Sequence, residues 1–266
     1  MKAIFFDLDD TLLWDKKSVE TAFQKTCEYA ATKVDIDPKE LETSVREEAS
    51  KLYDTFETRT FTQMIGINPF EGLWGTFDDP SEDFQKMKAI APVYQLKAWL
   101  KGLQKLDIDD ITLGEELAEY FPKMRKESPF VYEETFEVLD LLKGKYILFL
   151  ITNGSPSLQN KKLEITPKIA PYFDQIIISG AFGKGKPDPS IFKHALELAG
   201  VNKDEALMVG DNLMTDILGA SKVGMKSVWI NRENKPTSKE VKPTYTIANL
   251  HELLTILEYK KNVSVH

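Results

Sequence analysis

The stretch FFDLDDTLL, Phe5 to Leu13, joins an apolar run to three closely spaced carboxylates. Acidic side chains are usually solvated and rarely follow a core strand. Asp7 and Asp9 are two positions apart, so an extended chain projects both side chains from the same side. With Thr11 two residues further on, the stretch predicts a buried strand that delivers polar groups to a site at its end.

The overall composition indicates a globular protein with a substantial core. Of 266 residues, 42% are hydrophobic and 29% are charged, a balance unlike that of disordered chains. The formal net charge of -8 argues against nucleic acid as a partner, because a nucleic-acid surface needs clustered Lys and Arg. The run between Lys2 and Asp7 is too short for a signal peptide, and no stretch approaches the ~20 apolar residues of a membrane span. We therefore expect a cytoplasmic protein without a membrane partner.

Five short apolar runs predict buried strands of a parallel sheet. They are Ala3–Phe6, Tyr146–Ile151, Gln175–Ile178, Ala206–Val209 and Lys226–Ile230. From the second run onward, segments with helical patterns separate the strands: Pro156–Tyr172, Pro189–Ala199 and Thr215–Val223. This alternation is typical of an α/β protein, and we expect a Rossmann-like core in which helices cover a parallel sheet to give three layers.

The interval between Phe6 and Tyr146 is far longer than the ~30 residues of a strand–helix–strand unit. Helical patterns fill most of it, at Ser18–Lys33, Pro38–Leu52, Asp83–Leu106 and Gly114–Lys126. The Gly- and Pro-containing stretch 58–80 is expected to be loop and short turns. The sequence therefore predicts a catalytic core of residues 1–14 and 131–266, interrupted by an all-helical cap domain of residues 15–130.

Polar side chains follow four consecutive predicted strands. They are Asp7, Asp9 and Thr11, then Thr152 and Asn153, then Lys184 and Lys186, then Asp211 and Asp216. The carboxyl ends of parallel strands share one edge of a sheet, where ligands bind in open α/β folds. We therefore expect these side chains to form a single site.

The chemistry that fits this set is phosphoryl transfer with Mg²⁺, a hard cation that prefers oxygen ligands. Asp7 and Asp211 could supply metal-binding carboxylates, and a carboxylate can also attack phosphorus. Asp9 could protonate the leaving oxygen, while Thr152 could hold phosphate oxygens. Lys186 would offset the negative charges that otherwise keep a carboxylate away from a phosphate dianion.

The motifs in this order resemble the haloacid dehalogenase (HAD) superfamily of phosphohydrolases. The matching residues are Asp7-Leu-Asp9-Asp-Thr11, Thr152-Asn-Gly, Lys186-Pro-Asp-Pro, and Gly210-Asp211 followed by Asp216. The long insert between the first two motifs is similar to the helical cap of that superfamily. The resemblance covers essentially the whole chain, although the cap matches only in position and helical character.

The resemblance implies a role for each motif residue. Asp7 would be the nucleophile and Asp9 the general acid and base, with Mg²⁺ held by Asp7, the backbone carbonyl of Asp9, and Asp211. Thr152, Asn153 and Lys186 would bind the substrate phosphate. Thr11 and Asp216 would contact and orient these residues without touching the substrate. The expected activity is Mg²⁺-dependent hydrolysis of a small phosphorylated metabolite through an aspartyl-phosphate.

Several other functions fit parts of the pattern less well. A metal-independent haloacid dehalogenase or a phosphonatase typically lacks the second aspartate, which is Asp9 here, and a phosphomutase typically has Gly-Val after the aspartates. The P-loop-like stretch from Gly180 to Lys186 continues with Pro187, where that motif needs Ser or Thr. A non-catalytic protein that binds a phosphorylated ligand is the alternative from another class.

The sequence leaves the substrate and the cap residues that select it open. Nucleoside monophosphates, sugar phosphates, phosphoserine and phosphoglycolate all fit, because a fold does not set a substrate. Protein partners are unknown. Whether Lys184 assists or replaces Lys186 is also open. The cap aromatics Tyr53, Trp74, Tyr94 and Trp99 are interpreted as core, and the stretch 58–80 as the place for a substrate-contacting residue.

Overall fold

The structure, a computed structural model, describes residues 1–263 and divides the chain into two compact units. The core unit comprises Met1–Trp14, Val131–Asn153 and the chain from Thr166 onward. The inserted unit comprises Asp15–Phe130 and Gly154–Ile165. The chain therefore passes between the units after residues 14, 130, 153 and 165.

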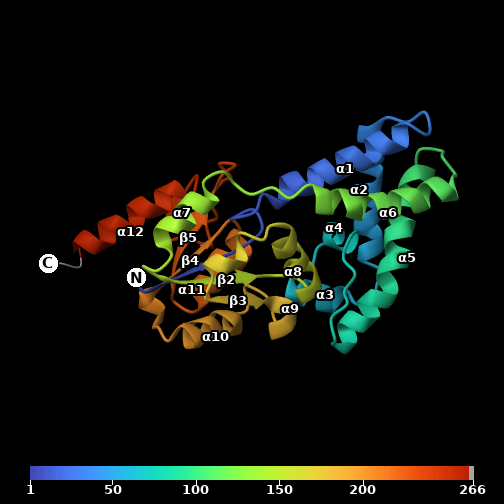
Figure 1. Cartoon of the computed structure of the whole chain (residues 1–266). Helices are drawn as coiled ribbons and strands as arrows, with labels where there is room; N and C mark the ends of the chain where they lie inside the picture. The colour runs from blue at the N-terminus through green and yellow to red at the C-terminus, as the bar shows by residue number, and fades with distance from the viewer. Residues whose placement is uncertain (264–266) are drawn as a thin grey trace. The chain divides into compact units, whose positions relative to one another are not determined.

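The core unit contains a six-stranded parallel sheet in the order β3-β2-β1-β4-β5-β6 (Figure 1). The strands are β1 (Ala3–Phe6), β2 (Ile147–Thr152), β3 (Gln175–Ile178), β4 (Ala206–Gly210), β5 (Lys226–Ile230) and β6 (Tyr245–Ile247). Central β1 pairs with β2 and β4, so that Phe5 lies opposite both Phe149 and Met208. These residues are buried from both faces, which explains why β1 reads as an uninterrupted apolar run.

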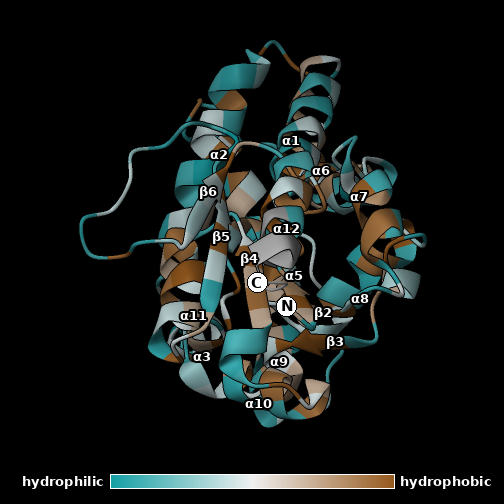
Figure 2. Ribbon diagram, turned by 90° about the vertical axis from the view of Figure 1, so that its left-hand side faces the viewer, coloured by the Kyte–Doolittle hydropathy of each residue, from teal (hydrophilic) through white to brown (hydrophobic). Residues whose placement is uncertain are grey.

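Helices cover both faces of the sheet, as predicted for a Rossmann-like fold. They are α7 (Thr135–Leu142), α9 (Ser179–Phe182), α10 (Pro189–Ala199), α11 (Leu218–Lys222) and α12 (His251–Val263). Phe5 and Met208 pack with Ile191 and Phe192 of α10 in one apolar cluster. Figure 1 shows α7 and α12 on the other side of the sheet from α10. Figure 2 shows both hydrophilic and hydrophobic residues in α10, as expected for a helix with one packed face.

Three elements of the structure differ from the prediction for residues 131–266. The strand β6 was not predicted, because it has only three residues and follows a turn-rich stretch. The predicted helix Pro156–Tyr172 is α8 (Pro156–Ile165) followed by a separate 3₁₀ turn, Ala170–Tyr172. The predicted helix Thr215–Val223 begins as a π-helical segment, Leu213–Ile217, and continues as α11.

The described part of the inserted unit is built from helices. They are α1 (Asp15–Ala31), α2 (Pro38–Tyr53), α3 (Arg59–Ile65), α4 (Pro69–Gly72), α5 (Glu82–Gln104) and α6 (Ile111–Glu127), with α8. Buried Phe23, Trp99 and Phe121 form the centre of its core, with ring centroids 4.6–6.0 Å apart. Tyr53 and Trp74 are buried in the same cluster, as interpreted from the sequence.

The helix α8 lies in the inserted unit, although the sequence assigned all of residues 131–266 to the core. Leu158 packs in the apolar cluster of the inserted unit. The backbone N–H and hydroxyl of Ser157 donate to the Asp79 carboxylate at 2.9 and 2.8 Å. The division into units differs from the expected one because these contacts join residues far apart in the sequence.

Among the described residues, none of the helices has the length and apolar character needed to span a bilayer.

A close contact between α5 and α2 in the inserted unit gives a test of this packing. A Cβ added at Gly102 of α5 would lie 2.4 Å from Val45 Cγ2 and 3.1 Å from Val45 Cα in α2. Gly102→Ala should therefore destabilise the protein by about 1–3 kcal/mol, although Ala normally favours a helix over Gly. The matched change Gly114→Ala meets the side chain of Leu100, which can rotate, and should cost little. Urea unfolding of both variants measures this, and a Gly102→Ala protein as stable as wild type would contradict the packing.

Candidate active site

The turn after β1 brings Asp7 and Thr11 together. The N–H groups of Leu12 and Leu13 donate to the Leu8 carbonyl, which closes the turn. Asp10 has φ +58°, a conformation that Asp tolerates better than most residues. The buried Thr11 hydroxyl donates to Asp7 Oδ2 at 3.3 Å. The sequence therefore forms a tight loop that fixes one oxygen of the first carboxylate.

Lys186 lies between two buried carboxylates. Its Nζ is 2.6 Å from Asp7 Oδ1 and 2.7 Å from Asp216 Oδ1, and it donates to the Ile151 carbonyl at 2.7 Å. The Lys186 side chain is 2% exposed. In contrast, the Lys184 side chain is 57% exposed and lies 3.8 Å from Asp188. The structure thus brings Lys186, and not Lys184, to the first aspartate.

The side-chain amide of Asn153 holds the backbone of Lys186 at both ends. Asn153 Oδ1 accepts from the Lys186 N–H at 2.8 Å, and Nδ2 donates to the Lys186 carbonyl at 2.9 Å. This arrangement suits positioning of the lysine more than direct phosphate binding by the amide. Neighbouring Thr152, at the carboxyl end of β2, is fully buried beside Ile178 of β3.

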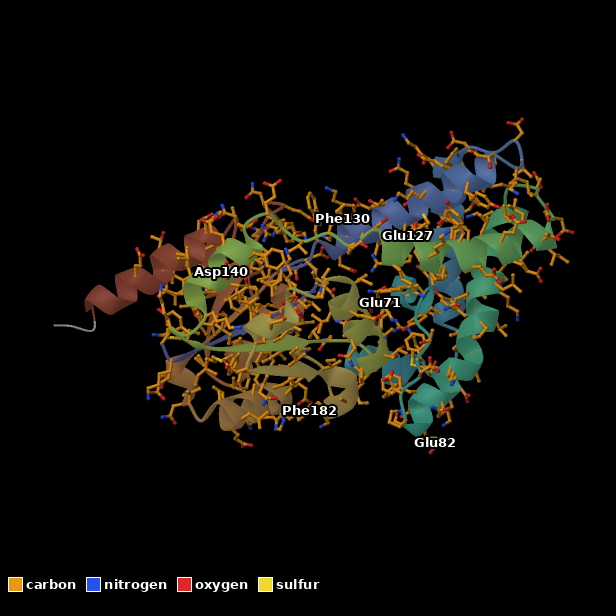
Figure 3. The ribbon with its side chains drawn as sticks, in the orientation of Figure 1. Glu71, Glu82, Glu127, Phe130, Asp140 and Phe182 are labelled. Atoms are coloured by element: carbon orange, nitrogen blue, oxygen red, sulfur yellow. The ribbon has the colours of Figure 1, made fainter. Side chains whose placement is uncertain are left out.

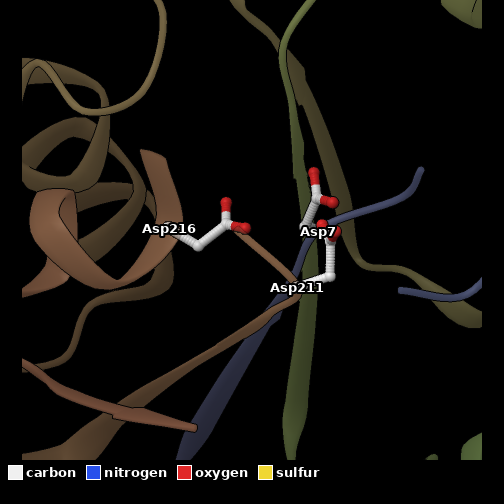
Figure 4. Close-up of side chains that lie close together, drawn as sticks. All are labelled: Asp7, Asp211 and Asp216. Carbon is white, nitrogen blue, oxygen red and sulfur yellow. The ribbon is translucent and has the colours of Figure 1, made fainter. Parts of the chain in front are cut away.

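Asp211 and Asp216 follow β4 and complete the acidic group. Asp7, Asp211 and Asp216 each offer a carboxylate oxygen, and these oxygens lie within 4.8 Å of one another (Figure 4). The Trp229 indole N–H donates to the Asp211 carbonyl at 2.8 Å, while the Asn212 N–H donates to Asp216 Oδ2 at 3.1 Å. The π-helical turn after β4 therefore directs Asp216 back toward the strand end, in a geometry often found at functional sites.

The electrostatics of this group favour an additional positive charge. Burial raises the pKa of Asp7 to about 6; Lys186 partly offsets that rise and Asp216 adds to it. Burial, followed by repulsion from Asp7 and Asp216, raises the pKa of Asp211 well above its usual value. Burial alone would lower the pKa of Lys186, but Asp216 and Asp7 raise it, so the lysine remains charged. One ammonium faces three carboxylates.

An oxygen-only donor set with excess negative charge fits a hard divalent cation such as Mg²⁺. The carboxylates of Asp7 and Asp211 are close enough together to share one ion. Asp9 lies two residues past Asp7 in the same turn, where it pairs with Leu13 in an isolated bridge. The sequence-predicted ligands Asp7, Asp9 and Asp211 therefore come from two adjacent strand ends of the core unit.

Arg232, which follows β5, was not predicted as a site residue from the sequence. Its guanidinium donates to the Thr11 carbonyl at 3.1 Å and pairs with Glu134 at 2.6 Å. The signal was available, because Arg232 comes two residues after the fifth strand, and only the ends of four strands were considered. Tyr132, next to Arg232, was also missed, since it lies outside every motif.

The inserted unit holds a separate buried ion network. Arg125 pairs with Asp15 at 2.7 Å, and Lys162 of α8 pairs with Glu71 of α4 at 3.0 Å. Glu71 is labelled in Figure 3. Burial would raise the pKa of Asp15, but Lys162 and Arg125 lower it below its usual value. The stretch 58–80, predicted to contact substrate, thus contributes Glu71 to an ion pair inside its own unit.

Comparison with known proteins assigns the family. The family model of haloacid dehalogenase-like hydrolases matches residues 1–224. The chain belongs to this family. It is 31% identical over 253 residues to the phosphoserine phosphatase of Thermus thermophilus, covering 95% of this chain and 98% of that protein. The recognised resemblance is confirmed, and the protein is a hydrolase that acts on phosphate monoesters.

Solved structures show the same fold. The HAD-hydrolase YfnB of Bacillus subtilis, solved bound to magnesium, has a TM-score of 0.64 and 23% identity, and the match covers 96% of this chain and 98% of that one. The L-2-haloacid dehalogenase of Xanthobacter autotrophicus has a TM-score of 0.60 and 16% identity, with coverage of 97% and 98%. The fold alone therefore does not separate phosphatases from dehalogenases, and the site residues must do so.

Lys184 and Lys186, which both follow β3, give a matched test. Lys186→Met should lower hydrolysis of p-nitrophenyl phosphate by about 10³-fold or more, because it removes the buried ammonium that lies 2.6 Å from Asp7 Oδ1. Lys184→Met should retain nearly full activity, since Lys184 is exposed. Circular dichroism is needed as a control, because Lys186→Met leaves two buried carboxylates without their partner. A folded Lys186→Met variant within tenfold of wild type would remove Lys186 from its role.

Gly210 gives a second test of the site. A Cβ at this position would lie 2.3 Å from Asp216 Oδ2 and 2.7 Å from Asp216 Cβ. Gly210→Ala should displace Asp216 and with it Lys186, and we expect activity to fall by about 10²-fold, as for a shift of about 1 Å at a reacting group. Steady-state kinetics measure the loss, and full activity would show that Asp216 does not orient Lys186.

Proposed function

We propose that this protein is a Mg²⁺-dependent phosphatase that hydrolyses a small phosphorylated metabolite through an aspartyl-phosphate on Asp7. The observation that carries the proposal is the position of Asp7. One of its oxygens is 2.6 Å from the buried Lys186 ammonium, and Asp211 lies in the same carboxylate group. A carboxylate that must meet a phosphate dianion needs this local positive charge, all the more on a chain of net charge -8.

Asp7 and Asp9 would carry the two chemical steps. In the first, an Asp7 carboxylate oxygen forms a bond to phosphorus as the ester P–O bond breaks, and Asp9 gives its proton to the leaving oxygen. In the second, Asp9 takes a proton from water, whose oxygen attacks phosphorus and releases phosphate from Asp7. The bonds from Thr11 and Lys186 orient Asp7 for the first attack.

The remaining residues would bind the phosphate and the metal. Thr152 and the backbone near Asn153 would hold phosphate oxygens, and Lys186 would neutralise part of their charge. Mg²⁺ would be held by the carboxylates of Asp7 and Asp211 and the backbone carbonyl of Asp9. When bound, it would supply charge compensation for the phosphoryl group.

Phosphoserine is the first substrate to test, because the Thermus relative matches almost the whole chain and is named for that activity. Nucleoside monophosphates, sugar phosphates and phosphoglycolate belong in the same panel. A dehalogenase activity is disfavoured, because Asp9 and Asp211 have no use in metal-free displacement of a halide. A protein that only binds a phosphorylated ligand would keep affinity for these esters without turnover.

Asp7→Asn and Asp10→Asn form a matched pair for testing this proposal. Both change a carboxylate to an amide within one turn, and Asn tolerates the left-handed conformation of residue 10. Asp7→Asn should abolish phosphate release from the panel, whereas Asp10→Asn should stay within about tenfold of wild type, because Asp10 is assigned no bond to phosphorus. EDTA should abolish phosphate release by the wild type, and added Mg²⁺ should restore it. Turnover that survives EDTA or Asp7→Asn would contradict the proposal.

A further inference from the structure

Two stretches of the core unit pair at the first two of the four points where the chain passes between the units, after residues 14 and 130. Leu13 and Val131 form an antiparallel bridge, and the Tyr132 N–H donates to the Leu12 carbonyl at 3.2 Å. The rings of Trp14 and Tyr132 stack with centroids 5.2 Å apart and planes at 16°. Both connections are therefore joined to each other within the core unit.

Arg232 lies on this junction and contacts it at three places. Its guanidinium carbon is 3.5 Å from the ring centroid of Tyr132. Nη1 is 2.6 Å from Glu134 Oε1, and Nη2 donates to the Thr11 carbonyl at 3.1 Å. The Arg232 side chain is only 17% exposed. A planar guanidinium can stack and donate in two directions at once, which a lysine cannot.

The contact with Thr11 connects Arg232 to the nucleophile. The backbone of Thr11 accepts from Arg232, and its hydroxyl donates to Asp7 Oδ2. Thr11 is fully buried, so its position is set by these contacts and by the turn. A shift of the Thr11 backbone would therefore alter the orientation of the Asp7 carboxylate.

We propose that Arg232 is a positioning residue, which fixes Thr11, and through it the Asp7 carboxylate, to the paired stretches at the first two connections between the units. This role rests on the proposed function, because it assigns Arg232 to the orientation of the nucleophile. Arg232 does not touch the reacting atoms. Its loss should lower the rate of the chemical step and leave substrate affinity nearly unchanged.

Arg46 offers a matched control in the inserted unit. Its guanidinium carbon lies 4.0 Å from the Phe23 ring centroid, and its Nη2 is 2.7 Å from Glu42. Arg46 thus combines the same stacking and ion pairing, but its partners include no residue of the turn after β1 that carries Asp7 and Thr11. Any effect of losing a stacked, paired arginine as such should appear at both positions.

The kinetic test compares Arg232→Ala, Arg232→Lys and Arg46→Ala on p-nitrophenyl phosphate at saturating Mg²⁺. For Arg232→Ala we expect kcat to fall about 10- to 100-fold with KM within about threefold. Arg232→Lys should not restore kcat, whereas millimolar guanidinium should partly restore it in Arg232→Ala alone. Arg46→Ala should keep wild-type kcat. Wild-type kcat in Arg232→Ala, or a loss confined to KM, would overturn the proposal.

A readout without turnover separates this inference from the proposed function. Trp14 is 39% exposed, whereas Trp74, Trp99 and Trp229 are at most 4% exposed, so acrylamide quenching of tryptophan fluorescence reports mainly on Trp14. Arg232→Ala should increase quenching by loosening the Trp14–Tyr132 stack, and Arg46→Ala should not. If the wild type hydrolyses no ester but quenching rises as expected, the proposed function fails while the junction held by Arg232 stands. Unchanged quenching overturns the junction itself.

Discussion

The pairing of Lys186 with Asp7 and Asp216 is the interaction on which the rest of the site depends. A buried ammonium is costly without partners, and two buried carboxylates repel each other without a cation. Each group is therefore stable in this position only because the others are present. The fold provides the meeting point, since Asp7 follows β1, Lys186 follows β3, and Asp216 follows β4.

Several residues outside the ion group hold it in place. Asn153 fixes the backbone of Lys186, and Trp229 fixes the backbone of Asp211. Gly210 leaves space for the Asp216 side chain, and a larger residue there would overlap it. The site is thus organised by Asn153 after β2, Gly210 at the end of β4 and Trp229 within β5 as well as by the motif side chains, which is typical of preorganised electrostatic sites.

The core strands and the site residues were predictable because each rests on a local pattern. The strands β1, β3 and β5 have the predicted bounds, since buried parallel strands are short and mostly apolar. Parallel topology then brings every strand end to one edge, so the residues after four strands could be grouped without knowing the strand order.

The missed features depend on contacts between distant residues. The assignment of α8 to the inserted unit rests on Leu158 packing in the apolar cluster of that unit and on Ser157 donating to Asp79, 78 residues away, which no local pattern reveals. The engagement of the Asn153 amide with Lys186 depends likewise on two separate loops. In the sequence, Arg232 is an ordinary loop residue after β5. Only its contacts with Thr11, Tyr132 and Glu134 identify it as part of the site.

The most direct measurement of the central claim is chemical trapping of the phosphorylated enzyme. The wild type would be quenched during turnover with Mg²⁺ and treated with borohydride, which reduces an aspartyl-phosphate to homoserine, and the peptides would be read by mass spectrometry. The account predicts homoserine at position 7 and at no other aspartate, and none without substrate. Homoserine at residue 9 or 211, or active enzyme that yields none, would contradict Asp7 as the nucleophile.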